Sequence, residues 1–325
     1  MERAHNEIDP PCAERTDRIP EDQSRLAIIA ADSDNRASSI VESLQRDQIV
    51  MVQHLGPDEA DNLMHSIADK LGIADSLKLQ AAFASVLGHR ENIGRYYMSV
   101  NKRSEYQFVA PHSEGNSFTN MQLSSFYCYE NTTDGGATIL MNIDESCTIW
   151  QGLREHLKRG RANRPLTAGE IRKIKVAFRL NMPEDTLKDD DEILDQTTVS
   201  PAFSVYNVLA KPRQTHSILL GRKLYAYWDS IERLDSDSAE EYFRFLRDHD
   251  LLRNPPGPPD VRMLDDSARH RIRHFGSRYG QLFKCKVTRK LQPGDFIVQN
   301  NLTWCHSVAN WTPGSGTRTV AAAFA

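Results

Sequence analysis

The chain has 325 residues, and 40 basic against 44 acidic side chains give a formal net charge of −4 at pH 7. This mild acidity gives no reason to expect a nucleic-acid partner, which would favour a basic face, and no apolar run approaches the roughly 18 residues of a membrane span. The length allows a substantial buried core in one large domain or two small ones.

The N-terminal residues and the cysteines suggest where the protein resides. Residues 1–25 are polar, contain prolines and lack the apolar core of a signal peptide, so we expect a loose tail there. The five cysteines form no C-x-x-C pair, which favours a reduced, intracellular protein. We therefore expect a cytoplasmic protein with a single domain over 26–325.

The first elements mix strands and helices. Residues 26–31 and 48–53 are short apolar runs typical of strands, and 37–46 has the pattern of a helix. Pro57 suits the first position of an amphipathic helix that reaches about Leu71. We expect one more helix around 76–87.

From Arg95 onward, short β-branched and aromatic runs replace the helical pattern. Many short strands, few helices and no regular alternation of strand and helix predict a mainly β protein, a sandwich or barrel core with helical additions. The expected strands lie at 96–100, 124–129, 137–141, 203–209, 216–228, 281–287, 295–299 and 317–324.

The middle of the chain, around 150–280, carries no recognisable chemical motif. We expect a helix over 145–159 and two more that begin at the capping-box spacings of Thr167 and Ser238. Residues 254–259, Asn-Pro-Pro-Gly-Pro-Pro, are a loop by composition. We interpret this stretch as a helical and loop insertion into the single domain.

The segment Ala110–Asn116 contains a potential metal-binding pair. His112 and Glu114 are two residues apart, so on an extended segment both side chains point to the same face. A second histidine from a distant strand would complete a 2-His-1-carboxylate triad, which holds Fe(II) on one face and leaves the opposite positions open. His306, near the C-terminus, is the candidate.

A basic residue follows that histidine on an apolar segment. Arg318 precedes Val320–Phe324, a run that indicates a buried strand. A buried arginine needs an anion, and its planar guanidinium suits a two-point contact with a carboxylate. The alternative is an ordinary surface arginine near the end of the chain.

In this order the motifs resemble those of the taurine dioxygenase / clavaminate synthase-like superfamily of Fe(II)/2-oxoglutarate oxygenases. That family has H-x-D/E, then Gly-Gly-x-Thr, then G-D-x-x-x-x-x-N, a distal histidine and an arginine. The matching segments here are His112-Ser113-Glu114, Gly135-Gly136-Ala137-Thr138, Gly294-Asp295 with Asn301, His306, and Arg318.

The resemblance implies a distorted double-stranded β-helix, the jelly-roll core. It also implies Fe(II) bound by His112, Glu114 and His306, with Arg318 and Thr138 binding the co-substrate 2-oxoglutarate. With O₂, such an enzyme hydroxylates, desaturates or cyclises a small amino-acid-like or natural-product substrate and releases succinate and CO₂. Candidate substrate-binding residues lie near the first motif: Arg95, Tyr97, Asn116, Phe118 and Gln122.

Other classes of protein stay open. A halogenase of the same fold is disfavoured, because those enzymes replace the carboxylate ligand and Glu114 is present. A metal-stabilised binding protein without catalysis would need neither Arg318 nor Thr138, and a zinc hydrolase of the H-E-x-x-H type lacks its motif here. Part of 180–275 could form a lid or wall over the metal, or a peripheral decoration.

Overall fold

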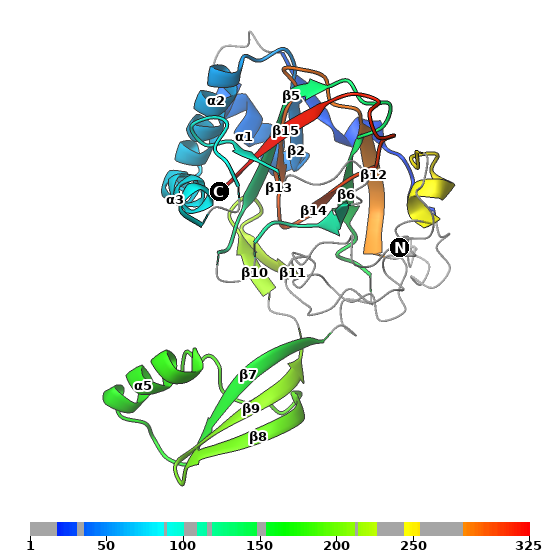
Figure 1. The fold of residues 1–325 in the computed structure, drawn as a ribbon. Helices are drawn as coiled ribbons and strands as arrows, with labels where there is room; N and C mark the ends of the chain where they lie inside the picture. The colour runs from blue at the N-terminus through cyan, green and yellow to red at the C-terminus, as the bar shows by residue number, and fades with distance from the viewer. Residues whose placement is uncertain are drawn as a thin grey trace, which may run out of the picture.

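A computed structural model describes residues 18–30, 36–87, 90–100, 109–115, 119–147, 154–211, 214–225, 244–253 and 282–325. Two β-sheets form the core, as Figure 1 shows. The larger sheet has the order β1 (Ala27–Ile29), β2 (Ile49–Val52), β13 (Phe296–Asn300), β5 (Leu123–Asn131), β15 (Arg318–Phe324) and β3 (Met98–Ser99). The smaller sheet has the order β12 (Phe283–Arg289), β6 (Thr138–Ile143), β14 (Trp304–Val308) and β4 (Val109–His112).

Successive strands alternate between the two sheets. β3 and β5 belong to the larger sheet and β4 and β6 to the smaller one, and β12 to β15 repeat the alternation from the other side. Phe126 and Ala322 from the larger sheet pack with Leu140 and Trp304 from the smaller one, so one apolar cluster fills the space between them. This arrangement is a double-stranded β-helix, and it confirms the predicted mainly β jelly-roll core with helical additions.

Three helices cover the outer face of the larger sheet (Figure 1). α2 begins at Pro57, where the Glu59 carboxylate accepts a hydrogen bond from the Gly56 backbone N–H. The apolar faces of the helices pack on a second cluster, which includes Val50, Tyr127 and Ala321. The helices are α1 (Arg36–Arg46), α2 (Pro57–Lys70) and α3 (Ala74–Leu87).

Part of the N-terminal stretch is packed against the core. Ile19 is buried, a short 3₁₀ helix, η2, spans Gln23–Arg25, and Glu21 accepts hydrogen bonds from Lys286 and from the Thr288 backbone of β12. The expectation of a loose tail through residue 25 is therefore wrong for 18–25. Residues 1–17 lie outside the described residues.

The middle of the chain differs from its prediction. Residues 155–159, the end of the helix expected over 145–159, belong to a strand instead, because residues 155–162 pair along their whole length with β9. The resulting sheet, order β7-β9-β8, extends away from the core in Figure 1 together with α5. α5 starts at the predicted capping box of Thr167. The elements here are β7 (Glu155–Ala162), α5 (Ala168–Phe178), β8 (Glu192–Ser200), β9 (Phe203–Ala210), β10 (Gln214–Ser217) and β11 (Arg222–Tyr225).

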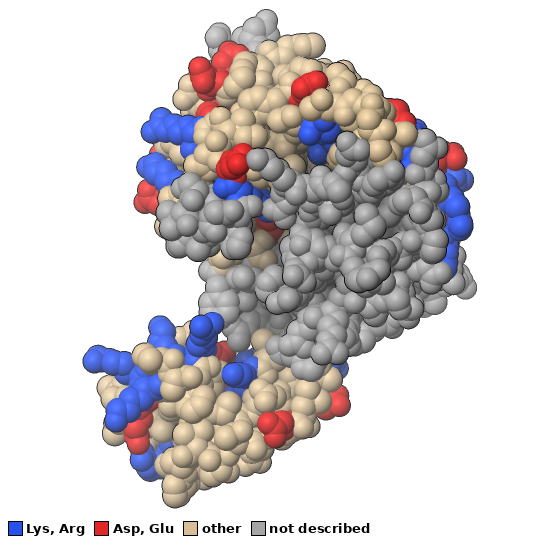
Figure 2. Space-filling model, in the orientation of Figure 1, with Lys and Arg blue, Asp and Glu red and all other residues tan. Residues whose placement is uncertain are grey.

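In the space-filling view of Figure 2, basic side chains gather over α5, where Arg172, Lys173 and Lys175 are exposed. Within the described part of the chain, no helix is long and apolar enough to cross a bilayer. Contrary to the expectation of reduced thiols throughout, Cys147 is disulfide-bonded. The buried free cysteines are Cys128, Cys285 and Cys305.

Candidate metal centre

Two imidazoles and one carboxylate meet where β14 lies beside β4. The strand register places His306 directly opposite His112, with their ring centroids 4.2 Å apart. Glu114 follows β4 and brings its Oε1 to 3.4 Å from His112 Nε2 and 3.5 Å from His306 Nε2. One donor atom from each residue lies within 4.8 Å of the others. The structure thus brings together the three residues predicted as metal ligands.

The charge states of these groups suit a metal ion. Burial and the neighbouring His112 lower the pKa of His306 to about 4, so its ring is neutral at pH 7. Burial alone would raise the pKa of Glu114, but the Arg90 charge and contacts with both histidines hold that pKa well below its usual value. An imidazole that binds a metal must be neutral and a carboxylate must be ionised, and His306 and Glu114 meet these conditions.

The donor set also fits the ion implied by the motif. Protein nitrogen and oxygen ligands lie about 2 Å from a divalent metal, and the three donors are close enough to share one ion. Two nitrogens and one oxygen on a single face suit Fe(II) and leave the other face open to further ligands. The site residues therefore fit an iron centre of the 2-His-1-carboxylate type.

The loop that carries Glu114 is held in place by Asn301. The Asn301 amide accepts a hydrogen bond from the Glu114 backbone N–H at 3.0 Å and donates to the Glu114 carbonyl at 2.9 Å. It also donates to the Met121 carbonyl at 2.9 Å. Gly115 has φ +89°, and a Cβ there would lie 2.5 Å from Thr119 Oγ1, so only glycine fits this turn. Sequence position alone did not indicate this role for Asn301.

The guanidinium group of Arg318 contacts Thr138, which lies two positions along β6 from the residue that pairs with His306. On β6, Leu140 pairs with His306, and Thr138 is the next residue on the same face, about 7 Å away along the strand. Arg318, at the start of β15, donates through Nη2 to Thr138 Oγ1 at 3.2 Å and through Nε to the Gly136 carbonyl at 3.0 Å. The two predicted 2-oxoglutarate-binding residues are therefore in contact.

Among the described residues, the Arg318 charge has no counter-ion. Burial lowers the pKa of Arg318 to about 10. Throughout the described ranges no carboxylate forms an ion pair with it, and its protein partners are a hydroxyl and a carbonyl oxygen. A partly buried cation without an anion is costly, so this environment favours an anionic ligand.

The two glycines of the Gly-Gly-x-Thr turn are required by close contacts. A Cβ at Gly136, where φ is +67°, would lie 2.9 Å from the Arg318 Cδ. A Cβ at Gly135 would lie 2.2 Å from the Asn310 carbonyl oxygen. Bulkier residues would thus displace Arg318 or the loop beyond β14. These contacts explain why both positions of the turn before Ala137 and Thr138 are glycines.

Three of the predicted substrate-binding residues do not face this site. Arg95 is exposed and stacks over Tyr96, 5.1 Å from the ring centroid. Tyr97 belongs to the cluster under the helices and hydrogen-bonds Ser125 at 2.5 Å, whereas its neighbour Met98 faces the space between the sheets. The assignments of Arg95 and Tyr97 as substrate-binding residues were wrong, because Met98 is the residue of this segment whose side chain faces the space between the sheets.

The third residue, Gln122, has a structural role. Its Oε1 accepts a hydrogen bond from the Ile218 backbone at 3.0 Å, and its Nε2 donates to the His216 carbonyl at 3.1 Å. Gln122 therefore attaches the β10–β11 hairpin to the core. Asn116 and Phe118 lie outside the described residues.

Arg90 is a residue of this site that the sequence analysis missed. Its Nη2 lies 3.6 Å from Glu114 Oε2, the carboxylate oxygen that faces away from the histidines. Its guanidinium lies over the Phe324 ring, 5.2 Å from the centroid. The residue occurs just after a predicted helix and outside every motif, so no local pattern could have identified it.

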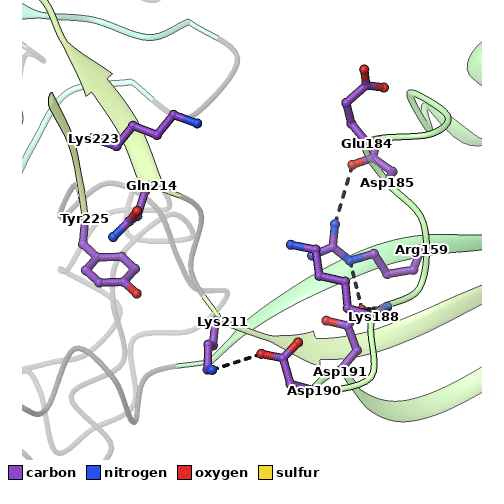
Figure 3. Close-up of a pocket in the computed structure, with 10 residues that line it drawn as sticks. All are labelled: Arg159, Glu184, Asp185, Lys188, Asp190, Asp191, Lys211, Gln214, Lys223 and Tyr225. Carbon is purple, nitrogen blue, oxygen red and sulfur yellow. Dashed lines mark hydrogen bonds and ion pairs between the residues drawn. The ribbon is translucent and has the colours of Figure 1, made fainter. Parts of the chain in front are cut away.

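A separate polar pocket of about 520 Å³ lies between the β7-β9-β8 unit and the β10–β11 hairpin (Figure 3). None of the three candidate ligands lines it. Several of its charged residues form ion pairs, among them Arg159 with Asp191 at 3.2 Å and Lys211 with Asp190 at 3.0 Å. We interpret this pocket as an ionic junction.

The prediction that part of 180–275 covers the metal stays untested for 226–243 and 254–275, which the structure does not describe.

The fold and the donor cluster define the class: a double-stranded β-helix protein with a 2-His-1-carboxylate cluster between its sheets.

No protein-family model matches the chain, and no curated protein matches it significantly. Among solved structures, AAD-2 in complex with Mn(II) and N-oxalylglycine has a TM-score of 0.36 and 13% identity, covering 94% of this chain and 96% of its own.

A second solved structure is similar to the same extent. A Burkholderia xenovorans protein assigned as an alpha-ketoglutarate-dependent 2,4-D dioxygenase has a TM-score of 0.36 and 12% identity, covering 92% of each chain. TM-scores this low carry no function from either structure to this chain. The function of this chain is therefore inferred from its own residues.

Proposed function

We propose that this chain is an Fe(II)- and 2-oxoglutarate-dependent dioxygenase of the taurine dioxygenase / clavaminate synthase-like superfamily. It oxidises a small amino-acid-like or natural-product substrate and releases succinate and CO₂. The main support is one juxtaposition. Thr138 lies about 7 Å along β6 from Leu140, the residue that pairs with His306, and Thr138 contacts a partly buried guanidinium that has no counter-ion among the described residues.

Each residue has a defined part in this proposal. His112, Glu114 and His306 hold one face of the iron, and the guanidinium of Arg318 takes the far carboxylate of 2-oxoglutarate. Thr138 Oγ1 accepts a hydrogen bond from Arg318, so the hydroxyl group of Thr138 can donate its own hydrogen to the far carboxylate of 2-oxoglutarate. Bound iron with O₂ supplies the oxidising chemistry, and the protein positions the substrate.

The alternative classes explain fewer of these features. A metal site that only stabilises a binding protein does not require a partly buried cation beside it that has no counter-ion among the described residues. A zinc hydrolase would need a bound water as nucleophile, and Arg318 would then have no ligand. Glu114 occupies the position that a halide would need, which disfavours a halogenase.

The direct test is coupled turnover. The purified protein is supplied with Fe(II), 2-oxoglutarate, O₂ and a panel of amino acids, and succinate is measured beside oxidised product. We expect one or more substrates to give equimolar succinate and product, with no halogenated product in excess chloride, and a Glu114→Ala variant to give neither succinate nor product. Metal-loaded protein that consumes no 2-oxoglutarate under any condition would refute the proposal.

A further inference from the structure

Arg90 is held at a defined place beside the metal cluster. The next residue, Glu91, is tied to β3: its N–H donates to Ser99 Oγ at 3.0 Å, and its carbonyl accepts from the Ser99 N–H at 2.7 Å. β3 in turn pairs with β15. This framework sets the Arg90 guanidinium over Phe324, at the end of β15, and beside Glu114.

Arg90 and Arg318 lie on opposite sides of the metal cluster. Ala322, on the interior face of β15, pairs with Phe126, whose ring lies 4.6 Å from that of His306. The cluster is thus near Ala322, between Arg318 at the start of the strand and Phe324 at its end. Those two Cα atoms are about 20 Å apart at the rise of an extended strand. With its distal carboxylate on Arg318, 2-oxoglutarate would extend from the start of the strand toward the metal, and Arg90 lies beside Glu114 toward the end of the strand.

The charges at the site leave Arg90 without full neutralisation. Two guanidinium groups and a divalent metal carry four positive charges, and Glu114 with dianionic 2-oxoglutarate carries three negative ones. Glu114 is the only acidic partner of Arg90 in the part of the chain that the structure describes, and their 3.6 Å separation is too long for a hydrogen bond. The donor groups of Arg90 are therefore available to another anion.

We propose that Arg90 binds a carboxylate of the substrate, so that the molecule oxidised by this protein is a small carboxylic acid such as an α-amino acid. This inference rests on the proposed function and specifies its substrate class. A guanidinium binds a carboxylate through two parallel hydrogen bonds. Held by Arg90, such a molecule lies across the metal from 2-oxoglutarate, on the side toward Phe324.

The test measures binding without turnover. Anaerobic protein loaded with Fe(II) and 2-oxoglutarate is titrated with small carboxylic acids, α-amino acids included, and with their amides, while the visible absorption band of the iron complex is followed. The variants are Arg90→Gln and Arg90→Lys. Arg95→Gln is the matched control, because Arg95 is exposed and stacks on Tyr96.

We expect at least one acid to shift the band of the wild type and of Arg95→Gln, and its amide to bind at least 10-fold more weakly. Arg90→Gln should lose about 10- to 100-fold in affinity for the acid while it binds 2-oxoglutarate as the wild type does. Arg90→Lys should recover part of the loss.

Equal binding of acid and amide, unchanged affinity in Arg90→Gln, or no shift with any acid would overturn the inference while the proposed function stands. If Arg90→Gln instead lost iron and kept its preference for the acid, Arg90 would only position Glu114, and the inference would be wrong. If the wild type formed no band with Fe(II) and 2-oxoglutarate, the proposed function would fail first.

Discussion

The side chain of Asn301 holds the backbone of Glu114 from both sides, accepting from its N–H at 3.0 Å and donating to its carbonyl at 2.9 Å. Asn301 is fully buried in the turn between β13 and β14, and Glu114 lies two residues beyond the end of β4. One amide thereby couples the acidic ligand to the turn that precedes the strand of His306.

Replacement of Asn301 should therefore weaken metal binding without removing a ligand. Partners that orient metal ligands commonly change metal affinity by about 10- to 100-fold, and we expect a loss in this range for Asn301→Ala. Titration with Fe(II) or Mn(II) measures it. Asn300→Ala is the control, since Asn300 caps the Leu302 N–H and has no contact with Glu114. Equal metal affinity in Asn301→Ala and wild type would contradict the role.

Arg318→Leu should separate co-substrate binding from metal binding. Loss of charge-assisted hydrogen bonds costs about 1.5–3 kcal/mol, or roughly 10- to 100-fold in affinity for 2-oxoglutarate. Iron content should stay unchanged, because Arg318 contacts Thr138 and Gly136 and no ligand of the metal. A 2-oxoglutarate titration that overlays that of the wild type would show that Arg318 binds something else.

Glu21→Gln should destabilise the fold, because it leaves the buried Lys286 ammonium without its counter-ion. Partial burial alone would raise the pKa of Glu21, but hydrogen bonds from Lys286 and Thr288 lower it overall. We expect the free energy of unfolding to fall by about 1–3 kcal/mol, toward the lower end because Glu21 is partly exposed.

The effect should depend on pH in one direction. A carboxyl whose pKa is lower in the folded state stabilises above its unfolded pKa and loses that contribution as pH falls through the folded value. The difference between wild type and Glu21→Gln in denaturant unfolding should therefore shrink below pH 4.5, the ordinary value for this carboxyl. A Glu21→Gln, Lys286→Met double variant should recover part of the stability. A difference that grows on acidification would contradict the ion pair.

The buried thiols should be unreactive in the native protein. Burial raises the pKa of Cys128 to about 11 and raises that of Cys305 further, so neither is a thiolate at pH 7. We expect alkylating reagents to leave the peptides of both residues unmodified until the chain is unfolded, as read by mass spectrometry. Rapid labelling of Cys305 in the folded protein would mean that β14 is more accessible than the structure has it.

The metal cluster could be predicted because the spacing of its residues in the sequence indicates a metal site. His112 and Glu114 share a face wherever the segment is extended, and His306 and Arg318 follow in the family's order. The sequence could not predict whether Tyr97 or Met98 faces the space between the sheets. β3 has only two residues, and its orientation depends on pairing with β15. The strand at 155–162 was likewise set by its pairing with β9, which overrode a local pattern that favoured a helix.

The proposed function requires that one site bind Fe(II) through His112, Glu114 and His306 and 2-oxoglutarate through Arg318. The most direct measurement is an anaerobic titration of the Fe(II)-loaded protein with 2-oxoglutarate, following the visible absorption of the complex. We predict a saturable band at one iron and one 2-oxoglutarate per chain, a band lost in His306→Ala, and a band in Arg318→Leu that forms only at much higher concentrations. Iron-loaded, folded wild-type protein that forms no such band, or a His306→Ala variant that forms it normally, would contradict the account.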